Sequence, residues 1–270
     1  MQKLEHKALL DAGVHFGHMK KKWNPKMKPY IFMEKRGIHI IDLNRTAECL
    51  QETAAAMRQM AKSGKKILFV ATKKQARAIV KEAALSVGMP FVTNRWLGGM
   101  MTNFSTIRRS IKKMQNIDRM LNDGTLDSVT KKERLTLTRE RDKLERDLGG
   151  IASLNRLPHA IFVVDIAHEH LAVAEAKTLG MKTFAMVDTN SNPNKVDYAV
   201  PANDDAIKSI NLLVDYFSNA VAEGGTKSAQ GKTEVKDQAL EKEILEKFEH
   251  DIDLTDADVE EENTEEEVTE

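Results

Sequence analysis

The sequence predicts an α/β protein in which helices cover both faces of a parallel sheet. Short, continuously apolar segments, such as residues 67–70 and 160–164, alternate with amphipathic segments that end at a glycine. Strands of a parallel sheet are buried on both faces and therefore read as unbroken apolar runs. A charged segment interrupts this alternation, and the chain ends in an acidic stretch. The predicted parts are an α/β domain over 1–102 and 149–222, an inserted helical hairpin over 103–148, and a mostly disordered acidic tail over 223–270.

The first elements follow from local stop signals and capping residues. Two prolines and two glycines between residues 15 and 37 argue against a long helix and favour a basic loop-rich segment. Asn44 or Thr46 can cap a following helix, which Gly64 would end. In chain order, the expected elements are a helix over 4–12, the loop-rich segment over 15–37, a strand over 38–41 and a helix to about Ser63.

The remaining elements repeat a strand-and-helix pattern. Each apolar run is short enough for a strand, and each amphipathic run that follows is closed by a glycine such as Gly88 or Gly180. In chain order, the expected elements are strands over 67–70, 91–92, 160–164, 183–187 and 198–200, and helices over 73–87, 168–179 and 203–222.

The segment 103–148 has a helical rather than a strand-like period. Apolar residues recur at steps of three and four, Asp123-Gly124 is a turn signal, and Gly149-Gly150 ends the segment. High charge and a narrow apolar stripe favour a protruding antiparallel hairpin, although two ordinary core helices remain an alternative. The stripe residues are Ile107, Ile111, Met114, Ile117, Leu121, Leu135, Leu137, Leu144 and Leu148.

Charge is segregated along a chain whose formal net charge is zero. Residues 1–160 carry 32 basic and 15 acidic residues, whereas residues 161–270 carry 9 basic and 26 acidic ones. A basic surface gains sequence-independent affinity for nucleic acid by counterion release, so this distribution predicts a chain that docks one face on a polyanion. Residues 223–270 hold 18 acidic and 5 basic residues and are expected to remain mobile.

The composition also indicates the cellular compartment of the protein. Cys49 is the single cysteine, so neither an intramolecular disulfide nor a cysteine-rich metal site can form. No apolar run approaches the roughly 20 residues of a membrane helix, and the N-terminus lacks a signal-peptide core. The sequence therefore predicts a soluble, cytoplasmic protein with no membrane partner.

No catalytic, cofactor or metal site can be assigned from the sequence. The turn after residues 67–70 lacks the glycines of a nucleotide-binding loop, which disfavours a nucleotide-dependent enzyme. Four aspartates follow expected strands, where helix capping is the favoured role. Whether either histidine pair binds a metal stays open. The aspartates are Asp165, Asp188, Asp204 and Asp205, and the pairs are His15 with His18 and His168 with His170.

Basic clusters with interleaved aromatic and amide side chains suit RNA backbones and unstacked bases. Lysines beside a helix N-terminus can also contact phosphate, although Lys73 and Lys74 could equally be solvated. The candidate RNA-binding residues are Lys20, Lys21, Lys22, Trp23, Asn24, Lys26, Lys28, Arg36, Lys73, Lys74, Arg95, Trp96, Asn103, Arg108, Arg109, Lys112 and Lys113.

Seven motifs of this chain resemble those of a known family, the bacterial small-subunit ribosomal protein S-two family. The resemblance covers residues 4–217. Two departures stand out. The family commonly has Asp-Pro-Arg where this chain has Asp165-Ile166-Ala167, and glycine where it has Ala71. The matching motifs lie at residues 10–18, 23–27, 37–43, 72–76, 95–99, 188–190 and 203–207.

The resemblance implies a flavodoxin-like sheet with an inserted coiled-coil hairpin. It also implies a structural constituent of the 30S subunit that binds 16S ribosomal RNA between head and body, contacts other small-subunit proteins and supports docking of ribosomal protein S-one for messenger RNA recruitment. It implies no catalytic activity and no cofactor. A free-standing RNA chaperone remains the alternative among binding proteins.

Overall fold

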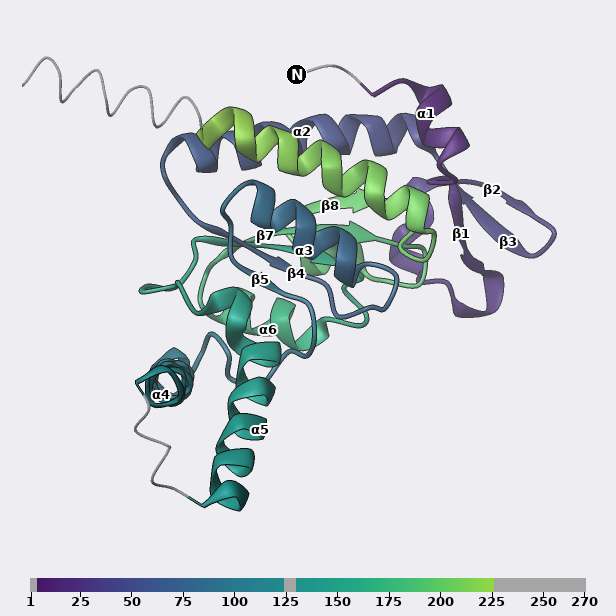
Figure 1. Cartoon of the computed structure of the whole chain (residues 1–270). Coiled ribbons are helices and arrows are strands. Elements are labelled where there is room, and N and C mark those ends of the chain that lie inside the picture. Colours follow the sequence, from purple (N-terminus) through teal and green to yellow (C-terminus); the bar gives the residue numbers. More distant parts are fainter. Residues whose placement is uncertain (1–3, 124–129, 226–270) are drawn as a thin grey trace, which may run out of the picture. The chain divides into compact units, whose positions relative to one another are not determined.

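A five-stranded sheet forms the centre of the computed structural model, which describes residues 4–123 and 130–225 (Figure 1). The strand order is β5-β4-β6-β7-β8, and every neighbouring pair is parallel. All residues of β4 and β6 are buried, which explains their continuously apolar sequences. The predicted α/β class is therefore confirmed. The strands are β4 (Ile67–Val70), β5 (Phe91–Val92), β6 (Ala160–Val164), β7 (Lys182–Val187) and β8 (Tyr198–Pro201).

Helices cover both faces of this sheet (Figure 1). Successive strand residues point to opposite faces, so Ile67 and Phe69 join one apolar cluster while Leu68 and Val70 join the other. The first cluster also contains side chains of α2, α3 and the helix over 207–225, and the second contains those of α6. The labelled helices are α2 (Leu43–Lys62), α3 (Arg77–Ser86) and α6 (His170–Thr178).

A second, three-stranded antiparallel sheet lies in the N-terminal part of the chain, after α1 (His6–Asp11). Its hairpin turns at Arg36 and Gly37, which both have positive φ (54° and 76°), as a two-residue turn between twisted strands requires. We call residues 16–41 the basic arm. Its order is β1-β3-β2, with β1 (Phe16–Met19), β2 (Ile31–Lys35) and β3 (Ile38–Ile41).

The expectation of a loop over 15–37 was wrong, because β1 and β2 lie within it. Four of the five residues of β2 are exposed, so the strand has no buried face and lacks the alternation that predicts a strand. Its regular structure comes from backbone pairing with β3, the strand that the sequence did predict.

The inserted segment contains α4 (Phe104–Asn122) and α5 (Lys131–Leu148), which contact each other. α4 buries Ile107, Ile111, Met114 and Ile117, as its periodicity predicted. On α5 only Leu148 is buried. In Figure 1, α4 is seen along its axis and α5 from the side, so the two axes are steeply inclined. The coiled coil stays a prediction, and the remainder of the expected turn, from Gly124, lies outside the described residues.

The last helix runs over residues 207–225, slightly beyond its expected end at 222. A Cβ on Gly224 would lie 2.4 Å from the backbone oxygen of Arg58 on α2, so glycine allows the two helices to approach closely. Glu223 also pairs with Arg58, at 3.4 Å. The remainder of the expected acidic tail, residues 226–270, lies outside the described residues.

Candidate nucleic-acid interface

The basic arm presents its cationic side chains to solvent. Asn24 Oδ1 accepts a hydrogen bond from Lys26 N (3.0 Å) and begins a short helix with Pro25 at its first position. Met27 of this helix is fully buried and joins the apolar cluster on the α6 face, so the neighbouring lysines project outward. The two 3-10 helices of the arm are η1 (Lys20–Lys22) and η2 (Pro25–Tyr30), and its exposed cations are Lys20, Lys21, Lys22, Lys26, Lys28, Lys35 and Arg36.

Backbone contacts fasten the arm to the loop after β7. Thr189 Oγ1 accepts a hydrogen bond from His18 N (2.7 Å), and Thr189 O accepts one from Asn24 N (2.8 Å). A Cβ on Gly17 would lie 2.5 Å from Thr189 Cγ2, so this approach requires glycine. The position of the basic side chains therefore depends on a polar joint rather than on a core of the arm itself.

The two tryptophans occupy different environments. Trp23 is half-buried, with its ring centroid 5.0 Å from that of His39. Trp96 is buried, and its Nε1 donates to Glu175 Oε1 at 3.1 Å. Trp23 keeps exposed surface that could stack on a base, whereas Trp96 is held inside the protein.

Glu175 on α6 organises the loop that follows Trp96. Its carboxylate also accepts hydrogen bonds from the backbone nitrogens of Gly99 (2.8 Å), Met101 (2.9 Å) and Thr102 (3.0 Å). Burial alone would raise the pKa of Glu175, but these donors together lower it below its ordinary value. Sequence reasoning missed this residue, because a glutamate in an amphipathic helix normally indicates a solvated face.

The candidates around the start of α4 divide into free and engaged side chains. Arg95, Arg109 and Lys112 are exposed. Arg108 is half-buried, and its Nη1 donates to the backbone oxygen of Leu154 at 2.6 Å. Two further candidates are exposed but engaged. Asn103 Oδ1 accepts a hydrogen bond from Thr106 Oγ1 (2.8 Å), and Lys113 pairs with Glu140 on α5.

The adjacent lysines Lys73 and Lys74 are separated by the structure. Lys74 is exposed. Lys73 Nζ lies 3.2 Å from Asp165 Oδ2, 2.7 Å from Asp204 Oδ1 and 2.6 Å from Asp205 Oδ1. Burial alone would lower the pKa of Lys73, but the carboxylates raise it well above its usual value. These three contacts match the three donors of an ammonium group, so Lys73 has no donor left for a phosphate.

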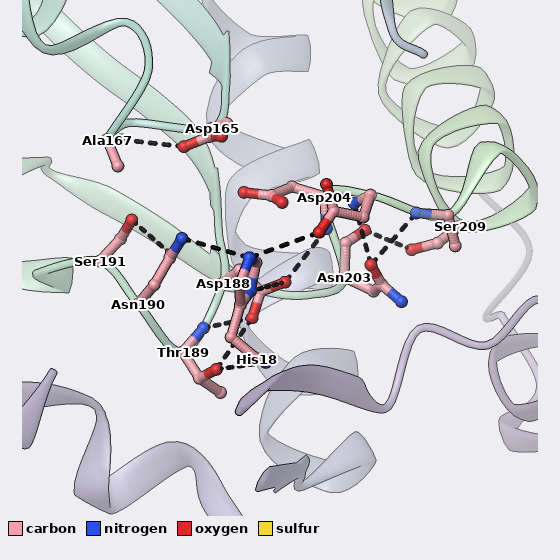
Figure 2. A network of polar contacts seen from close by, with 12 residues as sticks. His18, Asp165, Ala167, Asp188, Thr189, Asn190, Ser191, Asn203, Asp204 and Ser209 are labelled. Atoms are coloured by element: carbon pink, nitrogen blue, oxygen red, sulfur yellow. Dashed lines mark hydrogen bonds and ion pairs between the residues drawn. The ribbon is translucent and has the colours of Figure 1, made fainter. Parts of the chain in front are cut away.

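The partners of Lys73 belong to a polar cluster at the carboxyl edge of the parallel sheet, where the ends of β4, β6, β7 and β8 meet (Figure 2). We call His18, Lys73, Asp165, Asp188, Asp204 and Asp205 the edge cluster. Asp165 has a positive φ of 67°, and its Oδ1 accepts hydrogen bonds from Ala167 N and His168 N. Asp165 therefore holds the turn that precedes α6, in addition to its ion pair. The expected helix-capping role was wrong for this residue, because α6 begins at His170 and its N-cap residue is Glu169.

Charge within the edge cluster shifts several pKa values. Burial and the repulsion of Asp188 and Asp165 raise the pKa of Asp204 to about 7, although Lys73 opposes the shift. A hydrogen bond to Asp188, whose Oδ2 lies 3.1 Å from His18 Nδ1, raises the pKa of His18. The ends of three strands, β6, β7 and β8, therefore bring more carboxylate charge together than the cations of the cluster neutralise. The aspartates after successive strands were the sequence signal for this arrangement.

The other histidines form no comparable group. His168 and His170 are exposed, and neither belongs to a cluster of potential metal ligands within the described residues. Burial lowers the pKa of His15, the other member of the N-terminal pair. None of the described helices is long and apolar enough to span a membrane.

The parallel sheet carries an internal ion cluster at its carboxyl edge, has exposed basic side chains outside this cluster and lacks a nucleotide-binding loop. This arrangement is typical of a binding protein. Residues 9–224 match the sequence model of the family described as ribosomal protein S2. The chain belongs to this family. It is therefore a structural ribosomal protein, not an enzyme, and it is cytoplasmic.

Three relatives show how far the similarity extends, and each is described as small ribosomal subunit protein uS2. The protein of Cytophaga hutchinsonii is 56% identical over 235 residues, which cover 87% of this chain and 92% of the relative. That of Chlorobaculum tepidum is 55% identical over 242 residues, or 89% and 97% of the two chains. That of Parabacteroides distasonis is 58% identical over 224 residues, or 83% and 81%.

Proposed function

We propose that this ribosomal protein is a structural constituent of the small subunit, binds 16S ribosomal RNA between head and body, and supports docking of ribosomal protein S-one. One observation in particular supports the proposed binding to RNA. The basic arm and the basic start of α4 are both anchored in the apolar cluster on the α6 face, through Met27 and Ile107. Two segments far apart in sequence thus present exposed cations from one supporting layer.

The candidate residues take two roles in this proposal. Exposed side chains contact the RNA, mostly at phosphates, because lysine and arginine bind phosphate without reading sequence. Half-buried Trp23 stacks on an unpaired base. Asn24, Lys73, Trp96 and Arg108 hold the surface in shape through the contacts described above. The proposed contact residues are Lys20, Lys21, Lys22, Trp23, Lys26, Lys28, Arg36, Lys74, Arg95, Asn103, Arg109, Lys112 and Lys113.

The proposed function also assigns the chain to separate structural parts. We propose an α/β domain over 1–102 and 149–222 and an inserted helical hairpin over 103–148. The ion pair of Arg141 Nε with Asp118 Oδ1 (2.6 Å) supports pairing within the hairpin. Family membership supports the contact with ribosomal protein S-one.

A matched pair of double charge reversals tests the RNA-binding surface. Lys21→Glu with Lys26→Glu alters the arm, and Lys62→Glu with Lys65→Glu makes the same charge change at exposed residues around the end of α2. Each variant is added to small-subunit particles that lack this protein, over a series of salt concentrations. The arm variant should bind more weakly and with a shallower salt dependence, because fewer counterions are released, while the control variant should bind like the wild type.

Two outcomes would contradict the proposal. Equal binding of the arm variant and the wild type would show that the arm does not contact RNA. Equal affinity of the wild type for unrelated RNAs would instead favour the RNA chaperone. Docking of ribosomal protein S-one is measured separately, as the amount retained by particles with and without this chain; equal retention would remove that part alone.

A further inference from the structure

We propose that His18, Asp188 and Asp204 bind one divalent transition-metal ion of the Zn²⁺ type, and that this ion fastens the basic arm to the carboxyl edge of the sheet. The three residues come from β1, the end of β7 and the end of β8, and their side chains converge (Figure 2). The inference concerns a site within the protein and does not depend on the proposed RNA contacts.

The spacing of the three side chains fits a compact metal site. Each offers one potential ligand atom, and these atoms lie within 4.8 Å of one another. His18 Nδ1 and Asp188 Oδ2 are already 3.1 Å apart. Tetrahedral zinc with bonds of about 2.0–2.1 Å places its ligands about 3.3 Å apart. The His18–Asp188 pair is therefore already at ligand spacing, and the carboxylate of Asp204 would move closer to complete the site.

A second observation is the unused oxygen of Asp204. Its side chain is fully buried, and Oδ1 is engaged by Lys73 at 2.7 Å. Oδ2 accepts no hydrogen bond from any described residue. A buried carboxylate oxygen without a partner bears a desolvation cost that no contact offsets. A cation next to Oδ2 would remove this cost.

The charge of the edge cluster also favours a cation. Four carboxylates, those of Asp165, Asp188, Asp204 and Asp205, face the single ammonium of Lys73 together with His18. With His18 neutral and all four carboxylates ionised, as metal coordination requires, the cluster carries three excess negative charges. A divalent ion reduces this excess to one.

The ligand types select the kind of ion. An imidazole nitrogen with two carboxylate oxygens suits zinc, with a water molecule as the fourth ligand. Mg²⁺ prefers six oxygen ligands in octahedral geometry, so the histidine disfavours it. The side chain of Asp205 is 52% exposed and pairs with Lys73 and with His18 Nε2, which leaves it outside the three-residue group.

Such an ion would have a defined structural effect. His18 lies in β1, directly before the lysines of η1, and no residue of β1 or β2 is buried. Coordination would fix β1 against the loop after β7, in addition to the backbone contacts at Thr189. The ion would thereby limit the motion of the basic arm.

Metal binding by the purified full chain tests the site. Zinc is titrated calorimetrically into metal-free protein in 5 mM Mg²⁺, and the bound metal is counted after dialysis. We expect one Zn²⁺ per chain for the wild type. Loss of second-shell partners alone weakens metal sites 10–100-fold, so Asp204→Asn and His18→Asn should bind about a hundredfold more weakly. The control variant His170→Gln, at an exposed histidine outside the edge cluster, should retain binding.

The outcomes separate this site from its rivals. Full binding by Asp204→Asn, or displacement of zinc by the Mg²⁺ present, would overturn the proposal. If a variant fails to fold, as judged by circular dichroism, X-ray absorption of the zinc-loaded wild type replaces it. One imidazole with oxygen ligands would support the site, whereas sulfur from Cys49 or two imidazoles from His168 and His170 would overturn it.

Discussion

The two sheets of this protein are stabilised in different ways. In the parallel sheet, β4 and β6 are buried throughout and lie between two apolar clusters. In the antiparallel sheet of the arm, most of β2 is exposed, and Phe32 keeps 71% of its surface. The first sheet gains its stability from apolar burial, whereas the second depends on backbone pairing, on the buried anchor Met27 and on hydrogen bonds and charges at its joint with the first.

This difference between the two sheets indicates which parts of the protein can offer a surface for RNA binding. A buried sheet leaves no backbone or side chain for a partner, so its contribution to RNA binding is support. The arm can carry many lysines because it buries little, and its position is set elsewhere, at Thr189 and the edge cluster. Variants should therefore divide into those that unfold the protein, those that loosen the joint and those that change only binding.

The largest effect is expected in the parallel sheet. Phe162 is fully buried in β6, between the rings of Phe69 (5.3 Å) and Phe217 (5.2 Å). Phe162→Ala should lower the free energy of unfolding by about 4 kcal/mol, because transfer and cavity terms add. Phe32→Ala in the arm is the control and should change it by less than about 0.5 kcal/mol. Urea denaturation measures both, and similar losses would contradict the comparison.

The next effect is expected at the edge cluster. Lys73→Met removes the ammonium from three carboxylates and should destabilise the protein by about 3 kcal/mol, since the buried charges lose their partner. Lys74→Met, at an exposed neighbour, should change stability by less than about 0.5 kcal/mol. Equal losses in thermal unfolding would show that the ion pairs of Lys73 contribute little.

These two lysines also show how far the sequence could predict the site. Both follow the same strand and look alike in sequence, yet one is internal and the other exposed. The sequence predicts that aspartates follow the strands, because the apolar runs that precede them are unmistakable. It cannot predict which of the adjacent lysines turns inward, because that depends on where Asp165, Asp204 and Asp205 meet in space.

The same reasoning separates the elements that were predicted from those that were missed. The strands of the parallel sheet lie within a residue of their predicted positions, because complete burial leaves a local apolar signature. The strands β1 and β2 were missed because neither has a buried face, so neither shows the alternation that predicts a strand. The contact between α4 and α5 was predicted from the helical period and the turn signal, but the inclination of their axes was not.

A smaller effect is expected where the two sheets meet. Gly17→Ala places a Cβ 2.5 Å from Thr189 Cγ2 and 3.0 Å from His39 O. Overpacking of this kind costs about 2 kcal/mol. Hydrogen exchange should then speed up in β1, β2 and β3 but not in β6. Gly98→Ala, at a position with open space, is the control. Unchanged exchange in the arm would show that the joint tolerates the methyl group.

A still smaller effect on stability is expected in the loop over residues 96–102. Glu175→Gln keeps an acceptor but loses the charge, so it should cost about 1 kcal/mol at pH 7. The pKa of Glu175 is lowered by the fold, so its contribution is present above the unfolded pKa of about 4.3 and is lost as the pH falls through the folded value. The stability difference from the wild type should therefore narrow below about pH 4. A constant difference between pH 3 and pH 7 would contradict this account.

The smallest effect on stability should accompany the largest effect on binding. Lys28→Glu reverses an exposed charge in η2, beside the buried anchor Met27. Its free energy of unfolding should stay within about 0.5 kcal/mol of the wild type. Its affinity for small-subunit RNA should fall, and more so at low salt, because each lost phosphate contact removes a released counterion. Met27→Ala in the same helix should do the reverse and lower stability by about 2 kcal/mol or more. If both variants changed stability equally, Lys28 would contribute to packing as Met27 does, and the distinction between the anchor and the binding surface of the arm would fail.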